Sequence, residues 1–172
     1  LDYRGSAGLD LLETLLFTPA GQIDANVIRS VLQLRSLIAP DVARLAALRP
    51  SPQVAGRLDD IVAAMREAGE DLDRRQTLAL EFWDLAVEAS RNVAYRLAFN
   101  SLRRVYDRCR ELLQAVLADE INDLPNYAAI AAAVHRGDAS MAEARGRELI
   151  RRGETAVNAA LRRLERAQRK AS

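Results

Sequence analysis

The sequence predicts an all-α fold, an antiparallel bundle of about six to seven helices. Apolar residues recur at helical spacing along almost the whole chain, and no stretch alternates as a strand would. Residues that cap or end helices lie between these segments. The connections are short, which favours antiparallel neighbours. One apolar stripe, at i, i+4, i+7, i+8 and i+11, is formed by Val54, Leu58, Ile61, Val62 and Met65.

The first half of the chain is expected to form four helices, over 7–17, 24–48, 52–69 and 72–89. Asp24 is a suitable N-cap for the second helix, whose apolar stripe runs from Val27 to Ile38. Pro40 lies inside that helix and should kink it, because proline lacks a backbone donor and clashes with the preceding turn. Ser51 and Pro52 supply a cap and a first-turn proline for the third helix.

The second half is expected to form three more helices, over 92–118, 125–136 and 139–168. Asn92, or Ser90, caps the long helix that follows the Ser-Arg-Asn break. Asp123 and Pro125 open the next helix, and Gly137-Asp138 ends it and caps the last one. The fold class therefore follows from both the periodicity and the punctuation.

Composition limits the class of protein. A chain of 172 residues is one domain by length, 1–172, and 49% hydrophobic with 28% charged residues is typical of a globular protein. No apolar run approaches the roughly 18–20 residues of a membrane helix. The formal net charge is +1, without the basic stripe that binds phosphate backbones, so the chain alone is a poor DNA binder. One cysteine, Cys109, excludes an internal disulfide and is compatible with a cytoplasmic location.

Signatures of enzymes, metal sites and cofactor sites are scarce. The one histidine, His135, precedes the helix-ending Gly137, and nothing near it completes a catalytic set. There is no nucleophile elbow, phosphate-binding glycine loop, HExxH or CxxC. With one histidine and one cysteine, a nitrogen- or sulfur-rich metal site cannot be assembled. The sequence predicts no catalytic residue, no metal and no cofactor.

Polar and aromatic residues embedded in helical faces remain. Trp83, Tyr95 and Tyr127 each have an ordinary explanation as core or core-edge residues. Asn100, within "LAFNSL", is harder to dismiss, because asparagine is a poor helix former and a buried one would need partners. Arg35, just before Pro40, is a further candidate for the wall of a ligand pocket.

Four stretches resemble the effector-binding and dimerisation domain, the FCD type, of the FadR branch of GntR-family transcription regulators. They cover essentially the whole chain, and their order and spacing carry the resemblance: "GLDLLETL", "RSLIAPDVARLAALR", "EFWDLAVEASRNVAYRLAFNSLRRVYDR" and "NYAAIAAAVHRGDASMAEA". The resemblance implies a helical ligand-binding domain. It also implies that residues 1–6 are the exit from an N-terminal winged helix-turn-helix domain absent from this chain.

The sequence departs from this family where most members bind a divalent metal through one aspartate and three histidines. The aspartate position falls on Ala79 and the first histidine position on Trp83. The second falls on Tyr127, and the third on or next to Leu149. The resemblance therefore implies a pocket without metal, and Ala79 and Trp83 at i, i+4 still share one helical face.

A metal-free pocket resembles that of FadR itself, which responds to long-chain acyl-CoA. We expect an acyl-CoA or other acyl effector, a homodimer, DNA binding only through the missing N-terminal domain, no membrane association and a cytoplasmic location. Three alternatives remain: a metal-free sensor of a small organic acid held by Arg35, a dimerisation-only domain with a plugged pocket, and an enzyme on a helical scaffold. The expected ligand-binding residues are Arg35, Ala79, Trp83, Tyr95, Asn100, Arg104, Tyr127 and Leu149.

Overall fold

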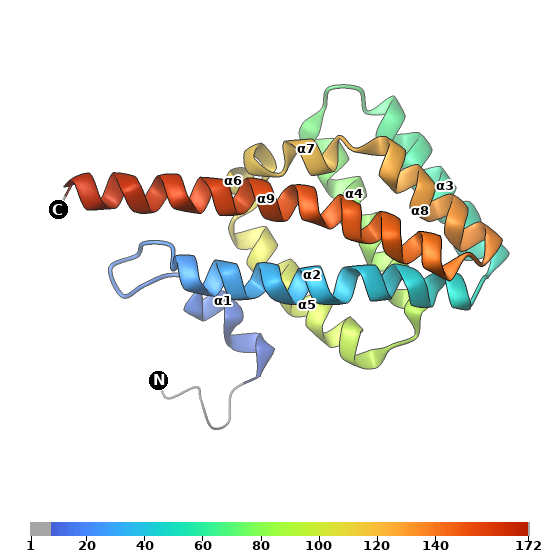
Figure 1. Cartoon of the computed structure of the whole chain (residues 1–172), viewed down its shortest axis with the longest axis horizontal. Coiled ribbons are helices and arrows are strands. Elements are labelled where there is room, and N and C mark those ends of the chain that lie inside the picture. Colours follow the sequence, from blue (N-terminus) through green and yellow to red (C-terminus); the bar gives the residue numbers. More distant parts are fainter. Residues whose placement is uncertain (1–7, 172) are drawn as a thin grey trace.

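The computed structural model describes residues 8–171, which are almost entirely helical (Figure 1). The all-α prediction is confirmed: within 8–171 no strand forms, and a single antiparallel bridge pairs Phe17 with Ile23. The expected domain exit at 1–6 lies outside the described residues. The elements are η1 (Leu9–Leu11), α1 (Leu12–Leu15), α2 (Ala25–Leu48), α3 (Pro52–Glu67), α4 (Leu72–Ser90), α5 (Val93–Arg108), α6 (Arg110–Val116), α7 (Ala118–Ile121), α8 (Leu124–Arg136) and α9 (Ala139–Ala171).

The predicted caps begin the helices as expected. Asp24 Oδ1 accepts hydrogen bonds from the backbone N–H groups of Asn26, at 2.8 Å, and Val27, at 3.3 Å. Asn92 caps α5 in the same way, with its Oδ1 3.0 Å from the backbone nitrogen of Ala94. These side chains satisfy backbone donors that the first turn of a helix leaves unpaired. The punctuation of the sequence is therefore a reliable guide to where the helices begin.

The helix expected over 92–118 is instead two helices, α5 and α6, with a third, α7, beginning where it was expected to end; this is the main difference from the prediction. The backbone leaves the α-helical region at Cys109 (φ −115°, ψ 19°) and at Leu117 (φ −92°, ψ 9°). Neither break contains glycine or proline, so local sequence does not mark them. The breaks let Cys109, Leu117 and Ile121 all turn into one apolar cluster, so tertiary packing overrides helix continuity. The first expected helix is also shorter, since only η1 and α1 form there.

Helices α2 and α9 lie side by side and run antiparallel along the molecule (Figure 1). A Cβ added at Gly146 of α9 would lie 3.4 Å from both Ala43 Cβ and Pro40 Cα of α2. A methyl group at this position would therefore meet α2 at van der Waals contact distance, so the two helices pack closely here. Helix α2 continues through Pro40.

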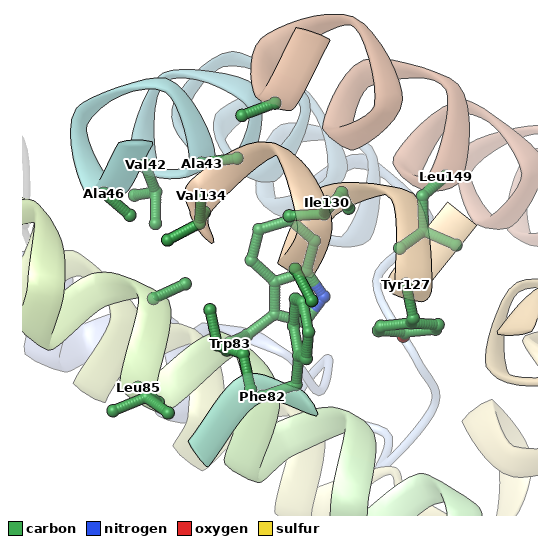
Figure 2. Packing of buried hydrophobic residues seen from close by; sticks show 14 of the residues in the cluster. Val42, Ala43, Ala46, Phe82, Trp83, Leu85, Tyr127, Ile130, Val134 and Leu149 are labelled. Atoms are coloured by element: carbon green, nitrogen blue, oxygen red, sulfur yellow. The ribbon is translucent and has the colours of Figure 1, made fainter. Parts of the chain in front are cut away.

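Two apolar clusters stabilise the bundle. The first cluster gathers side chains of α2, α3, α4, α8 and α9 around Phe82, Trp83 and Tyr127 (Figure 2). The second cluster joins α2, α5, α7 and α9 with Leu16, through residues such as Leu32, Leu117 and Val157. Both clusters share α2 and α9, so these two helices connect the halves of the core. No helix within the described residues is long and apolar enough to span a membrane.

Candidate functional site

A cavity of about 120 Å³ lies where the two clusters meet; we call it the junction cavity. Its walls are mostly apolar, and Arg103 of α5 is the one exposed residue in its lining, so the cavity reaches the surface near that side chain. From the first cluster the lining takes Ala39, Val42, Ala79, Trp83, Val87, Tyr127 and Ile150. From the second it takes Ile28, Leu32, Val105, Leu117, Ile121 and Val157.

An ion pair between Arg35 of α2 and Glu120 of α7 lines this cavity. Arg35 Nη1 donates to Glu120 Oε2 at 3.0 Å, and Nη2 donates to the other carboxylate oxygen, so the pairing is two-pronged. The Glu120 side chain is 3% exposed and the Arg35 side chain 22%. Burial raises the pKa of the Glu120 carboxyl, and the facing guanidinium opposes that rise. For Arg35, burial lowers the pKa, but the attraction of Glu120 outweighs it and the net pKa is raised.

Gly153 of α9 makes room for the Glu120 carboxylate. A Cβ at this position would overlap Glu120 Oε2 and lie 2.8 Å from Leu117 Cδ2. Real carbon atoms do not approach so closely, so any larger residue would displace either the carboxylate or α7. The ion pair therefore depends on three helices: α2 for the arginine, α7 for the glutamate and α9 for the space.

Trp83 and Tyr127 present two buried polar atoms to one another, the indole N–H of the first and the hydroxyl of the second (Figure 2). Neither Trp83 Nε1 nor Tyr127 Oη has a partner at ordinary hydrogen-bond distance and angle among the described residues, yet the indole N–H lies close enough to the hydroxyl to lower its pKa, against the larger effect of burial. Phe82 holds both rings by edge-to-face contacts, with centroids 5.9 Å from Trp83 and 5.1 Å from Tyr127. The indole nitrogen lies on the side of Trp83 that faces Tyr127 (Figure 2). Because unpaired buried polar atoms are uncommon in proteins, this pair is a candidate contact for a ligand group.

A second tyrosine lies near this pair, on α5. Tyr106 lines the cavity, and its hydroxyl accepts a hydrogen bond from Gln76 Nε2 at 2.8 Å. Burial raises the pKa of Tyr106. The charges of Glu120 and Arg35 both act on the hydroxyl of Tyr127, so these groups form one polar cluster in an otherwise apolar cavity.

The residues at the family's metal positions do not fit a metal ion. Ala79, Trp83 and Leu149 offer no electron pair that a divalent cation would bind. Burial raises the pKa of Tyr127 well above its usual range, so its hydroxyl keeps its proton and is a poor ligand. Among the described residues, no three histidine, cysteine or acidic side chains gather as a metal site would require.

The structure brings four of the eight expected site residues to the junction cavity: Arg35, Ala79, Trp83 and Tyr127. Leu149 is fully buried in the first cluster, near Tyr127, but does not line the cavity (Figure 2). The expected face of α4 is therefore the one that meets the cavity, as the i, i+4 spacing of Ala79 and Trp83 indicated.

The other three lie elsewhere. Asn100 and Arg104 are exposed, because the buried face of α5 is formed by Ala98, Ser101 and Val105 and these two residues lie off it. The expectation that Asn100 faces inward is corrected by this placement. The hydroxyl of Tyr95 donates to Asp41 Oδ2 at 2.8 Å and ties α5 to α2 outside the cavity.

Two residues of the site were missed at the level of sequence, Glu120 and Gly153. Glu120 lies within "LADEIND", where neighbouring acids indicate a solvated surface segment. Gly153 lies within "IRRGETA", a charged stretch of a long helix, where one glycine has no distinctive signal. The breaks around α6 and α7, which the sequence does not mark, bring Glu120 to Arg35, and the packing of α9 brings Gly153 beside it.

Replacing Tyr127 by phenylalanine should stabilise the ligand-free domain by about 1 kcal/mol, because it removes a buried hydroxyl that has no partner. The ring and its edge-to-face contact with Phe82 stay in place. Urea denaturation of both proteins measures the difference as a shift in midpoint at constant slope. A loss of stability of 1 kcal/mol or more would show that the hydroxyl is bonded after all.

Comparison with known proteins adds family information to this geometry. The model of the FCD domain family matches residues 30–152. Two curated relatives are each 34% identical over 160 residues, which cover 93% of this chain: HTH-type transcriptional regulator Mce2R of Mycobacterium tuberculosis and uncharacterized HTH-type transcriptional regulator Mb0601 of Mycobacterium bovis. The match covers 66% of each relative, so the chain corresponds to just under two thirds of their length.

Proposed function

Because the chain belongs to the FCD domain family and is the FCD-type domain of a GntR-family transcriptional regulator, we propose that it binds a small-molecule effector in the junction cavity without metal. The observation that carries this proposal is the cavity itself, an apolar space lined by Trp83 and Tyr127, which stand at positions where the family resemblance implies metal ligands. Effector binding would then change how the regulator engages DNA.

The effector class that the cavity supports best is an acyl ligand, either a fatty acyl-CoA or another acyl compound. Apolar side chains dominate the lining, and each methylene buried there contributes about 0.8 kcal/mol. An engineered cavity of about 150 Å³ binds benzene, so 120 Å³ has room for a short alkyl segment. A longer chain would need the cavity to open. Arg103, at the surface end, is a suitable contact for an anionic group left outside.

The second candidate is a dimerisation-only domain whose pocket is plugged. The modest volume favours it, since binding sites for drug-sized ligands are usually about 300–1,000 Å³. Trp83 and Tyr127 are large buried side chains at positions where the family resemblance implies smaller metal-binding side chains. The small-acid alternative has less support, because Glu120 already occupies the guanidinium of Arg35.

The effect of ligand binding would reach the DNA-binding part through the helices that hold the ion pair. A ligand beside Arg35 and Glu120 contacts α2 and α7, and Gly153 couples α7 to α9. The effect on DNA binding cannot exceed the difference in the ligand's affinity for the two states of the domain. In the complete regulator we propose a cytoplasmic homodimer, DNA contact through a helix-turn-helix part, and no enzymatic activity.

Thermal unfolding with a panel of ligands tests the effector proposal. Straight-chain acyl compounds of four to ten carbons, as free acids, methyl esters and CoA thioesters, would each be added with EDTA or with zinc. A ligand at 100 times its Kd stabilises by about 2.7 kcal/mol, or roughly 5–10 °C for this chain length. We expect a shift that depends on chain length and is the same in EDTA and zinc.

A pair of matched variants tests whether the ligand-induced shift in unfolding temperature arises from binding in the cavity. Ala79→Leu fills the lining at a buried position and should abolish the ligand shift. Ala63→Leu makes the same change at an exposed position of α3 and should keep it. No shift with any compound would favour the plugged domain, and a shift that requires zinc would contradict a metal-free site.

A further inference from the structure

The charges inside the junction cavity cancel one another. The cation in the buried part of the cavity is Arg35. Its two terminal nitrogens donate to the two carboxylate oxygens of Glu120. Arg103 is exposed at the surface end. A ligand carboxylate entering the buried part would place a second anion beside Glu120 with no free guanidinium to receive it. Burial of a charge without a partner is strongly unfavourable.

Two buried polar groups that lack an ordinary partner, the indole of Trp83 and the hydroxyl of Tyr127, can each donate a hydrogen bond. The indole N–H of Trp83 can donate but cannot accept. Tyr127 keeps its proton, because burial raises its pKa well above the usual range. Both atoms lack a partner among the described residues, and both side chains are more than nine-tenths buried. A hydrocarbon ligand would leave both donors unpaired.

We infer that the junction cavity takes an uncharged carbonyl compound, an ester, thioester or ketone, whose oxygen accepts hydrogen bonds from Trp83 and Tyr127. Its short apolar groups lie against Ala79 on one side and Leu32 and Leu117 on the other. This inference rests on the proposed function and narrows its ligand class. The paired charges of Arg35 and Glu120 disfavour a carboxylate, and the two donors favour a carbonyl oxygen over a plain alkane.

Calorimetric titration of the whole chain with methyl hexanoate and with sodium hexanoate at pH 7.5 tests the inference. The two ligands have the same acyl chain and differ in the ester methyl group, which removes the charge. We expect the ester to bind at least tenfold more tightly than the acid. Tyr127→Phe should weaken ester binding about three- to tenfold, the usual effect of one neutral hydrogen bond, and leave the acid unchanged.

Tyr95→Phe is the matched control, because it removes the same atom from a tyrosine outside the cavity. It should leave the preference for the ester unchanged. Equal or tighter binding of hexanoate would overturn the inference while the effector cavity stands, since an acid would then displace Glu120 from Arg35. An unaltered ester affinity in Tyr127→Phe would also overturn it. Binding of neither ligand would overturn both the inference and the proposed function.

Discussion

Replacing Arg35 by methionine should destabilise the domain by about 3 kcal/mol at neutral pH, because Glu120 is then left buried without its partner. Methionine preserves most of the volume of the arginine stem, so the loss reports on charge rather than on packing. Urea denaturation would measure the free energy of unfolding of both proteins.

The loss should depend on pH in a defined direction. Burial already raises the pKa of Glu120 in the folded protein, and removing the guanidinium should raise it further. The folded state then binds the proton more tightly than the unfolded state, so stability falls as the pH rises above the unfolded value of about 4.3. The variant should therefore approach the wild type below that pH, where Glu120 is neutral in both states.

The double variant Arg35→Met/Glu120→Leu is the control for this interpretation. Replacing a whole buried pair by apolar side chains is often neutral or stabilising. We expect the double variant to recover most of the stability that the single variant loses. A double variant as unstable as Arg35→Met would mean that the cost lies in packing.

The second large effect is expected from Gly153→Ala, which should destabilise by about 2 kcal/mol. The added methyl group would occupy the place of the Glu120 carboxylate and press on Leu117. Helix propensity acts in the opposite direction, since alanine is better than glycine by about 1 kcal/mol in a helix interior. The clash should win because Glu120 is held by Arg35 and cannot turn away freely.

Gly56→Ala provides the matched control on α3. A Cβ there has no atom within 4 Å, so only the propensity term applies, and the variant should be more stable by up to about 1 kcal/mol. Thermal or urea unfolding of both variants measures the contrast. Equal stabilisation by the two substitutions would show that Glu120 does not occupy the space beside Gly153.

Much of the fold could be predicted because local signals specify it. Asp24, Ser51, Asn92 and Asp123 were expected to cap helices, and in the structure the side chain of each accepts a backbone N–H. Long amphipathic segments such as α2 and α4 have a clear period, so their extent and buried face follow from the residues. The breaks at Cys109 and Leu117 could not be predicted, because they depend on packing against distant helices.

The residues of the candidate site also fall into those that the sequence could predict and those that it could not. Ala79, Trp83 and Tyr127 were predicted from resemblance to a family pattern, and the structure places all three in the lining of one cavity. Asn100 was expected to face inward because asparagine is a poor helix former. In the structure the helical periodicity of α5 places it on the exposed face. Glu120 could not have been found, since its partner lies 85 residues away in the chain. A pairing over such a distance has no local signal.

The most direct test of a metal-free effector cavity is the fluorescence of Trp83, because it is the only tryptophan of the chain and lines the cavity. Emission of the wild type and of Ala79→Leu would be recorded in EDTA during titration with methyl hexanoate. We predict a saturable change in the wild type that is absent from the variant. An unchanged spectrum up to the solubility limit of the ester, or a change that appears only with zinc, would contradict the account.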